Sequence, residues 1–317
     1  MNRSHRMVSA IFLSLTVTAG TAGRALAEPV QLTKQHVQTL LPQDAELPGF
    51  TPVLFPMFSP HLPVHPLPGA EVEGLEARTL DASLHGVVTR IDRGWENGPF
   101  ELRLSARIWD SEATARAEVD YCRRTSSVVM DPGGPMGPVG DWSWSLEGSI
   151  FVQAGRFSGV VIGGLTREAR RAGERAVFPP ALRQALAHAF VVRASRIPEV
   201  SEVKSQAATV EANSKRLPQG AATLVCGQVY VRPLALAAAL GWQSEWDAER
   251  GVLTLRHPQW PATKKLVLPA VPGQVEESVT VPLWIDQGQP LMTLADLAQA
   301  IGGRLTAGAD GIYRVTR

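Results

Sequence analysis

The chain has 317 residues, of which 44% are hydrophobic and 19% are charged, and its 31 basic and 30 acidic residues leave a formal net charge of +1. This length and composition are typical of about two globular domains with hydrophobic cores. The balanced charge argues against a nucleic-acid-binding protein, which needs a basic stripe.

The first 27 residues have the three parts of a secretory signal peptide. Met1–Arg6 is basic, Met7–Ala19 is apolar, and Arg24-Ala-Leu-Ala27 supplies a small-residue site, so we expect cleavage after Ala27. The apolar run is shorter than the roughly 20 residues that a transmembrane helix needs. Without this segment the chain has 28 basic and 30 acidic residues, so its net charge is −2. The sequence therefore predicts a secreted or periplasmic protein with no transmembrane span.

Residues 28–196 predict an N-terminal α+β domain. A short helix is expected over 33–41, followed by a Pro-rich arm over 47–69 that we interpret as extended and irregular, because Pro removes a backbone donor. Phe100–Trp109 alternates apolar and polar residues with period two, as a half-buried antiparallel strand does.

The other expected elements of this domain are a helix over 111–125, a Gly/Pro loop over 131–140, strands near 142–146, 150–154 and 158–162, and a helix over 180–191. Their order favours an α+β fold, an antiparallel sheet with helices on one face. Residues 197–206 are polar and predict a linker.

The last third of the chain contains an internal repeat. Val231–Gly241 and Met292–Gly302 align without a gap. In each copy two apolar runs around a turn precede this stretch, and a further strand follows it after another turn. Residues 207–317 therefore predict a C-terminal α+β domain of two degenerate hairpin, helix and strand repeats.

The two expected helices begin differently. Thr293 and Asp296 have the spacing of a capping box at the start of the second helix. Pro233 fits the first turn of the first helix. Gly241 and Gly302 end the two helices, where a C-cap needs a positive φ.

The residues of the first copy resemble a known family. The stretches V-Y-V-R-P-L (229–234), L-A-A-A-L-G (236–241) and W-D-A-E-R-G-V-L-T-L (246–255) follow the order of the stalk-type domain named after the N-terminal domain of copper amine oxidases. The second copy departs from this pattern, because Thr293 replaces the Pro and Ala307-Gly308 replaces the Trp-Asp pair.

This resemblance implies an exported accessory module of bacterial envelope proteins, with no catalytic residues and no cofactor of its own. Amine oxidase activity belongs to a separate domain, which needs a quinone-forming Tyr after an Asn and a His-x-His copper site. No His-x-His occurs, and none of Tyr121, Tyr230 and Tyr313 follows an Asn.

Three tryptophans and two cysteines are the candidate site residues. Trp142 and Trp144 share one face of a strand, where they form either a solvated platform for sugar rings or a partner protein, or part of the core, which large aromatic residues usually fill. Trp95 is a third candidate for binding. Cys122 and Cys226 lie one in each predicted domain and are either a disulfide between the domains or two independent thiols.

Motifs for catalysis or metal binding are missing from the sequence. There is no Gly-x-Ser-x-Gly elbow and no Gly-Lys-Ser/Thr after Gly133-Gly134. His61 and His65 lack the Glu and the helical spacing of a zinc protease. We therefore predict no catalytic residue, no metal site and no cofactor.

The leading hypothesis is an exported, non-catalytic protein associated with the cell envelope, with a stalk-like module that binds or docks to an envelope component, a glycan or a protein. One alternative is a hydrolase of envelope polymers, with a site in the N-terminal domain near Trp95, Asp131 and Asp141. The other is a purely structural spacer.

Overall fold

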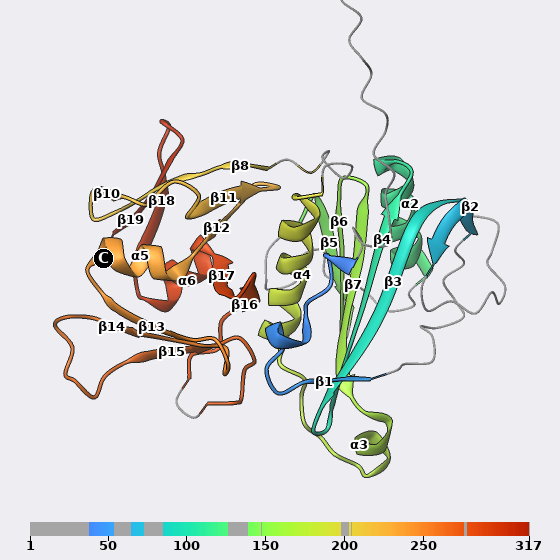
Figure 1. Ribbon diagram of the computed structural model, residues 1–317, viewed down its shortest axis with the longest axis horizontal. Helices are drawn as coiled ribbons and strands as arrows, with labels where there is room; N and C mark the ends of the chain where they lie inside the picture. Colours follow the sequence, from blue (N-terminus) through green and yellow to red (C-terminus); the bar gives the residue numbers. More distant parts are fainter. Residues whose placement is uncertain are drawn as a thin grey trace, which may run out of the picture. The chain divides into compact units, whose positions relative to one another are not determined.

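The structure is a computed structural model (Figure 1), and it describes residues 38–53, 65–72, 85–125, 139–146, 148–197, 203, 205–275 and 278–316. Residues Leu32–Arg317 form one compact unit. The expected signal peptide and most of the helix expected over 33–41 lie outside the described residues. The domain boundaries at residues 196 and 207 stay predictions.

The fold is α+β with open sheets, as the sequence predicts. The elements up to the end of the long buried helix are η1 (Asp44–Glu46), β1 (Thr51–Val53), β2 (His65–Val72), β3 (His85–Asn97), β4 (Phe100–Trp109), α2 (Glu112–Thr125), β5 (Trp142–Leu146), β6 (Ser149–Ala154), β7 (Phe157–Leu165), α3 (Arg167–Arg171) and α4 (Pro180–Ala194). Their strands form one seven-stranded sheet in the order β1-β3-β4-β7-β6-β5, with β2 also paired to β3.

Two strands form inside the Pro-rich arm, where an irregular chain was expected. β1 pairs antiparallel with Gly94–Glu96 of β3, and β2 runs parallel to the start of β3. Since β4 pairs along the other side of β3, both strands lie at the edge of the sheet. Pro is tolerated on an edge strand, because a missing N–H costs no ladder hydrogen bond there.

The sheet carries a helix on each face, which corrects the expectation that its helices share one face. The Phe157 ring packs against Phe190 of α4 with ring centroids 5.6 Å apart. The next residue, Ser158, donates a hydrogen bond of 2.6 Å to Glu118 of α2. Neighbouring residues of a strand point to opposite faces. Figure 1 shows α4 and α2 on the two sides of the sheet.

The remaining elements are β8 (Ser205–Ala207), β9 (Thr209–Ala212), β10 (Lys215–Arg216), β11 (Ala222–Val225), β12 (Gln228–Val231), α5 (Pro233–Leu240), β13 (Gln243–Asp247), β14 (Val252–Arg256), β15 (Leu266–Pro269), β16 (Leu283–Asp286), β17 (Gln289–Thr293), α6 (Leu294–Ala300), β18 (Arg304–Ala307) and β19 (Ile312–Thr316). They form three sheets, ordered β16-β17-β12-β11-β8, β10-β9-β19-β18 and β13-β14-β15.

The internal repeat is confirmed, and each copy has one more strand than expected. A hairpin (β11–β12 or β16–β17) leads into a helix (α5 or α6), and a second hairpin (β13–β14 or β18–β19) follows it. The additional strands are β13 and β18. Most of their side chains are exposed or half-buried and polar, so they carry no apolar pattern that predicts a strand.

Helix α4 is buried around its circumference, with 12 of its 15 residues buried. On one side it packs against β6 and β7, and on another it contacts β16 of the repeat. The His188 ring lies 5.5 Å from the Tyr230 ring and 6.0 Å from the Trp284 ring, measured between centroids. A single hydrophobic core therefore includes residues of the seven-stranded sheet, α4 and the repeat.

Candidate functional site

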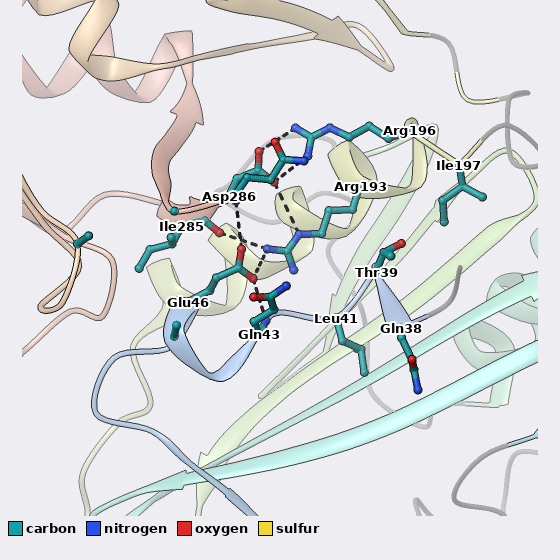
Figure 2. Close-up of a pocket in the computed structure, with 14 residues that line it drawn as sticks. Gln38, Thr39, Leu41, Gln43, Glu46, Arg193, Arg196, Ile197, Ile285 and Asp286 are labelled. Carbon is teal, nitrogen blue, oxygen red and sulfur yellow. Dashed lines mark hydrogen bonds and ion pairs between the residues drawn. The ribbon is translucent and has the colours of Figure 1, made fainter. Parts of the chain in front are cut away.

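A cleft of about 600 Å³ lies where the chain around η1, the end of α4 and the β16–β17 turn meet (Figure 2). Its lining residues are Gln38, Thr39, Leu41, Gln43, Ala45, Glu46, Arg193, Arg196, Ile197, Ala248, Ile285, Asp286, Gln287 and Gly288. This volume is within the range of roughly 300–1,000 Å³ typical of ligand pockets.

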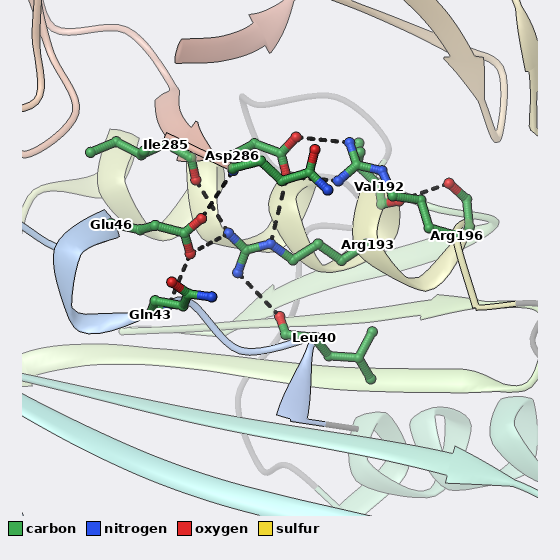
Figure 3. A network of polar contacts seen from close by, with 10 residues as sticks. Leu40, Gln43, Glu46, Val192, Arg193, Arg196, Ile285 and Asp286 are labelled. Carbon is green, nitrogen blue, oxygen red and sulfur yellow. Dashed lines mark hydrogen bonds and ion pairs between the residues drawn. The ribbon is translucent and has the colours of Figure 1, made fainter. Parts of the chain in front are cut away.

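Arg193 joins the three segments at the base of the cleft (Figure 3). Its Nη2 donates to Glu46 Oε2 at 2.7 Å and to the Ile285 carbonyl at 3.2 Å. Its Nη1 donates to the Leu40 carbonyl at 3.4 Å, and its Nε lies 3.8 Å from Asp286 Oδ1. One guanidinium on α4 therefore holds the N-terminal segment against the β16–β17 hairpin of the second copy.

Arg196 forms a two-pronged ion pair with Asp286. Its Nη1 and Nη2 lie 2.9 Å from Oδ1 and 2.8 Å from Oδ2. The Asp286 side chain is 1% exposed, whereas that of Arg196 is 40% exposed and borders the cleft. Parallel N–H to oxygen bonds of this kind are strong and fix geometry.

The acidic groups of the network have their oxygens occupied. Glu46 Oε1 accepts from the Gln287 N–H at 3.2 Å, and Glu46 Oε2 accepts from the Gln43 N–H at 2.8 Å as well as from Arg193. Two arginines face two carboxylates, so the network is neutral and each buried charge has a partner, as stable burial requires. Such a network suits a fixed junction better than proton transfer.

Local sequence places these groups. Arg193 lies in the last turn of α4 and Arg196 lies two residues past its end, and cations are favoured at a helix C-terminus. Asp286 precedes the two-residue turn Gln287-Gly288, where φ is 54° and 73°. Positive φ at both turn positions is the type I′ geometry that matches the twist of a hairpin.

The rim of the cleft combines amides with apolar side chains. Gln38, Gln43 and Gln287 are exposed there, and Leu41 and Ile285 form apolar wall. An amide both donates and accepts hydrogen bonds. The cleft can therefore bind a neutral, hydrogen-bonding ligand without disturbing the ion pairs below it.

A buried polar pair lies deeper in the same junction. His188 Nδ1 is 2.9 Å from the Tyr230 hydroxyl. Burial lowers the pKa of His188 from 6.5 to about 4, so the ring is neutral near pH 7. Burial, then the nearby Cys226 and Asp296, raise the pKa of Tyr230 above its usual value. Both groups are therefore uncharged inside the core.

The tryptophans proposed as a binding platform do not form one. Trp144 is 1% exposed and stacks on Phe151, with ring centroids 3.8 Å apart. Together with Val119 of α2 it forms a small core of its own. Trp142 is half-buried, and the Arg116 guanidinium lies 4.2 Å from its ring centroid. Helix α2 lies over this face of the sheet, which explains the burial.

Trp95 is also unavailable to a ligand. It is fully buried, and its Nε1 donates to Asp44 Oδ1 at 3.0 Å. Asp141 is exposed at the start of β5 and accepts from the Gly155 N–H at 2.9 Å. Trp95 pairs with Leu102 near the start of β4, whereas Asp141 borders strands that pair near the end of β4. The structure does not bring Trp95 and Asp141 together, and Asp131 lies outside the described residues.

The two cysteines stay untested as a pair. Cys226 is a thiol in the turn between β11 and β12, with φ of 47°. Cys122 belongs to α2, but its side chain is not among those described.

A metal site is absent from the part of the chain that the structure describes, because no group of three or more His, Cys, Asp or Glu side chains there is placed to hold a metal ion. His61 is not described. No described helix combines the length and apolarity that crossing a bilayer demands.

The sequence did not predict Arg193, Arg196 or Asp286 as site residues. Arg193 was the one hint in the sequence, because it is a charged residue in an otherwise apolar stretch of helix. No known family, no curated protein and no solved structure matches the chain.

Proposed function

We propose that this chain is an exported, non-catalytic binding protein of the cell envelope, and that its ligand docks in the cleft above Arg193 and Asp286. The observation that carries the proposal is the neutral ion-pair network beneath an amide and apolar rim. The N-terminal signal sequence and the stalk-domain resemblance of residues 207–317 support the location and the docking role.

The chemistry of the cleft favours a ligand that makes many weak hydrogen bonds. The rim amides fit the hydroxyl and acetamido groups of a glycan, or the backbone of an extended peptide. Its charged groups already bind one another, so a strongly charged ligand gains little. Both ligand sources share this neutral, hydrogen-bonding chemistry.

Filling the cleft tests the proposal. Ala248 is exposed and lines the cleft in the β13–β14 turn, so Ala248→Trp should occupy its space without touching an ion pair. Ala262 is exposed in the loop after β14 and does not line the cleft, which makes Ala262→Trp the matched control. The full chain and both variants are incubated with purified cell-wall glycan and, separately, with envelope protein.

The wild type and Ala262→Trp should be retained on one of the two materials, and Ala248→Trp should be retained less. Retention on glycan alone identifies a glycan ligand, and retention on protein alone identifies a protein partner. If the wild type is not retained on either material, or if all three proteins are retained equally, the proposal is wrong.

A further inference from the structure

A second, smaller cavity shares Arg196 with the cleft. It has a volume of about 60 Å³, and its lining includes Arg196, Arg232, Thr223 and Tyr230, with Val192 and Leu291 as apolar wall. Water needs roughly 10–15 Å³ of such space per molecule, so the cavity has room for about four waters or one small molecular ion. No carboxylate is among the lining residues that the structure describes.

Arg232 is the cation that the protein leaves uncompensated here. Its Nη1 is buried and has no hydrogen-bond partner among the residues that the structure describes. Within the same residues, Arg232 forms no ion pair with a carboxylate. Arg196, by contrast, is bound to Asp286 through both terminal nitrogens. Arg232 as a whole is half-buried, but a buried N–H of a cation that lacks a partner is unfavourable, so a ligand that supplies negative charge is favoured here.

The internal repeat provides an independent comparison. In the gapless alignment Arg232 corresponds to Thr293, and Ala235 corresponds to Asp296. Thr293 caps α6 by accepting from the Asp296 N–H at 3.0 Å, and the Asp296 carboxylate completes that helix start. Arg232 makes no side-chain cap on α5 and lines the cavity instead. The first copy therefore has a cation where the second has a capping hydroxyl, and an alanine where the second has a carboxylate.

We propose that the cavity binds a small carboxylate, of the size of formate or acetate, between Arg232 and the Thr223 hydroxyl. A guanidinium presents parallel N–H donors that match the two oxygens of a carboxylate. The cavity is too small for a sugar ring, so this site is separate from the cleft and goes beyond the proposed function. The bound anion lies between the end of α4 and the β11–β12 hairpin.

Binding at this place stabilises the junction. An anion that binds the folded chain and not the unfolded chain raises the unfolding temperature as its concentration rises. Formate should therefore raise the unfolding temperature of the full chain, whereas formamide, which has the same shape and no charge, should not.

The experiment measures saturation transfer from the full chain to formate by proton NMR. Wild type should show transfer, and Arg232→Gln should bind formate on the order of tenfold more weakly. Arg216→Gln is the matched control, because Arg216 is exposed on β10 and pairs with Glu211 away from the cavity. Acetate and a dipeptide with a free C-terminal carboxylate form two further arms, which distinguish a free small acid from the end of a peptide.

Thr223→Val keeps the shape of the cavity wall and removes its hydroxyl, so it should also bind formate more weakly. This variant tests the proposal if circular dichroism shows that Arg232→Gln does not fold. No transfer to formate or acetate in folded wild type overturns the proposal, and water is then the occupant. Equal transfer in wild type and in a folded Arg232→Gln or Thr223→Val variant overturns it as well. If chloride reduces the transfer to formate in the wild type, and the transfer is lost in Arg232→Gln, the cavity binds anions as proposed.

Discussion

Val231 of β12 pairs with Met292 of β17, and these two residues occupy the same position in the two copies of the internal repeat. The copies therefore meet at equivalent points, antiparallel, in the middle of one sheet. This is the arrangement that a local two-fold axis through the Val231–Met292 pair produces. The repeat is thus a pseudo-symmetric pair, and differences between its halves mark places where one copy has acquired a role of its own.

Replacing Arg193 with Met should lower the free energy of unfolding by about 3–5 kcal/mol. The Met side chain fills much of the same space, but it leaves Glu46 and Asp286 without the buried cation they share, which is the costly case for buried ion pairs. Urea denaturation followed by circular dichroism measures the change. Arg216→Met removes an exposed partner of Glu211 and should cost about 0–1 kcal/mol. Equal effects of the two substitutions would show that the junction network is not stabilising.

His188 should make stability depend on pH in the acidic range. Its pKa is about 4 in the folded chain against an ordinary 6.5, so between these pH values the unfolded chain binds the extra proton. Stability should therefore fall as pH drops from about 6.5 to about 4, by roughly 3 kcal/mol, with no further loss from this group below pH 4.

Urea midpoints of wild type and His188→Asn between pH 7.5 and pH 4 measure this effect. Other groups titrate in the same range, so the difference between the two proteins isolates His188. The variant should lose less stability on acidification than the wild type does. Parallel pH profiles would contradict the buried neutral state of the ring.

Replacing Gly163 with Ala should destabilise the protein, whereas replacing Gly164 with Ala should not. A Cβ at Gly163 falls on the Phe178 ring, which is 3% exposed and packs edge-on against Phe100 at 5.7 Å. Overpacking of this kind costs about 1–3 kcal/mol. A Cβ at Gly164 meets no described atom within 4 Å, so Gly164→Ala should stay within about 0.5 kcal/mol of wild type. Thermal unfolding of both variants provides the test, and a destabilised Gly164→Ala with a neutral Gly163→Ala would reverse the assignment of faces in β7.

Removing the cap of α6 should destabilise the second copy. Thr293→Ala loses the hydrogen bond from the Asp296 N–H and should cost about 1 kcal/mol, whereas Thr293→Ser keeps an accepting hydroxyl and should cost less. Thr306→Ala, at an exposed position of β18, is the control and should be close to neutral. Guanidinium denaturation can resolve these differences. Similar costs for Ala and Ser at position 293 would exclude capping as the cause.

Local patterns predicted the helices α2 and α4 and the strands β4 to β7, but not several other strands. The strand Phe100–Trp109 has the expected bounds. The helix expected over 180–191 begins at the expected residue and ends slightly later, at Ala194. Alternation and capping depend on neighbours within a few residues, so they are visible in the sequence. The strand β3 was missed, because Arg90 and Asp92 are buried as an ion pair, and such charges suggest a surface loop.

The candidate site was beyond the reach of those patterns. Glu46, Arg193 and Asp286 come from three distant parts of the chain, and only the topology brings them into contact. Similarly, the burial of Trp144 depends on where α2 lies, and no pattern in β5 contains that information. The stalk-domain resemblance and export stay predictions.

Helix α4 is hidden on all sides by two partners that come from opposite ends of the chain. Cutting the chain after residue 196 would leave one fragment with a bare apolar helix, and the other without the helix whose His188 packs against Tyr230 and Trp284. Neither fragment would be a fair substitute for the whole protein in a binding assay. If a protease site is inserted between residues 197 and 206 and cleaved, we expect the two pieces to remain associated and to elute together, because both contact α4.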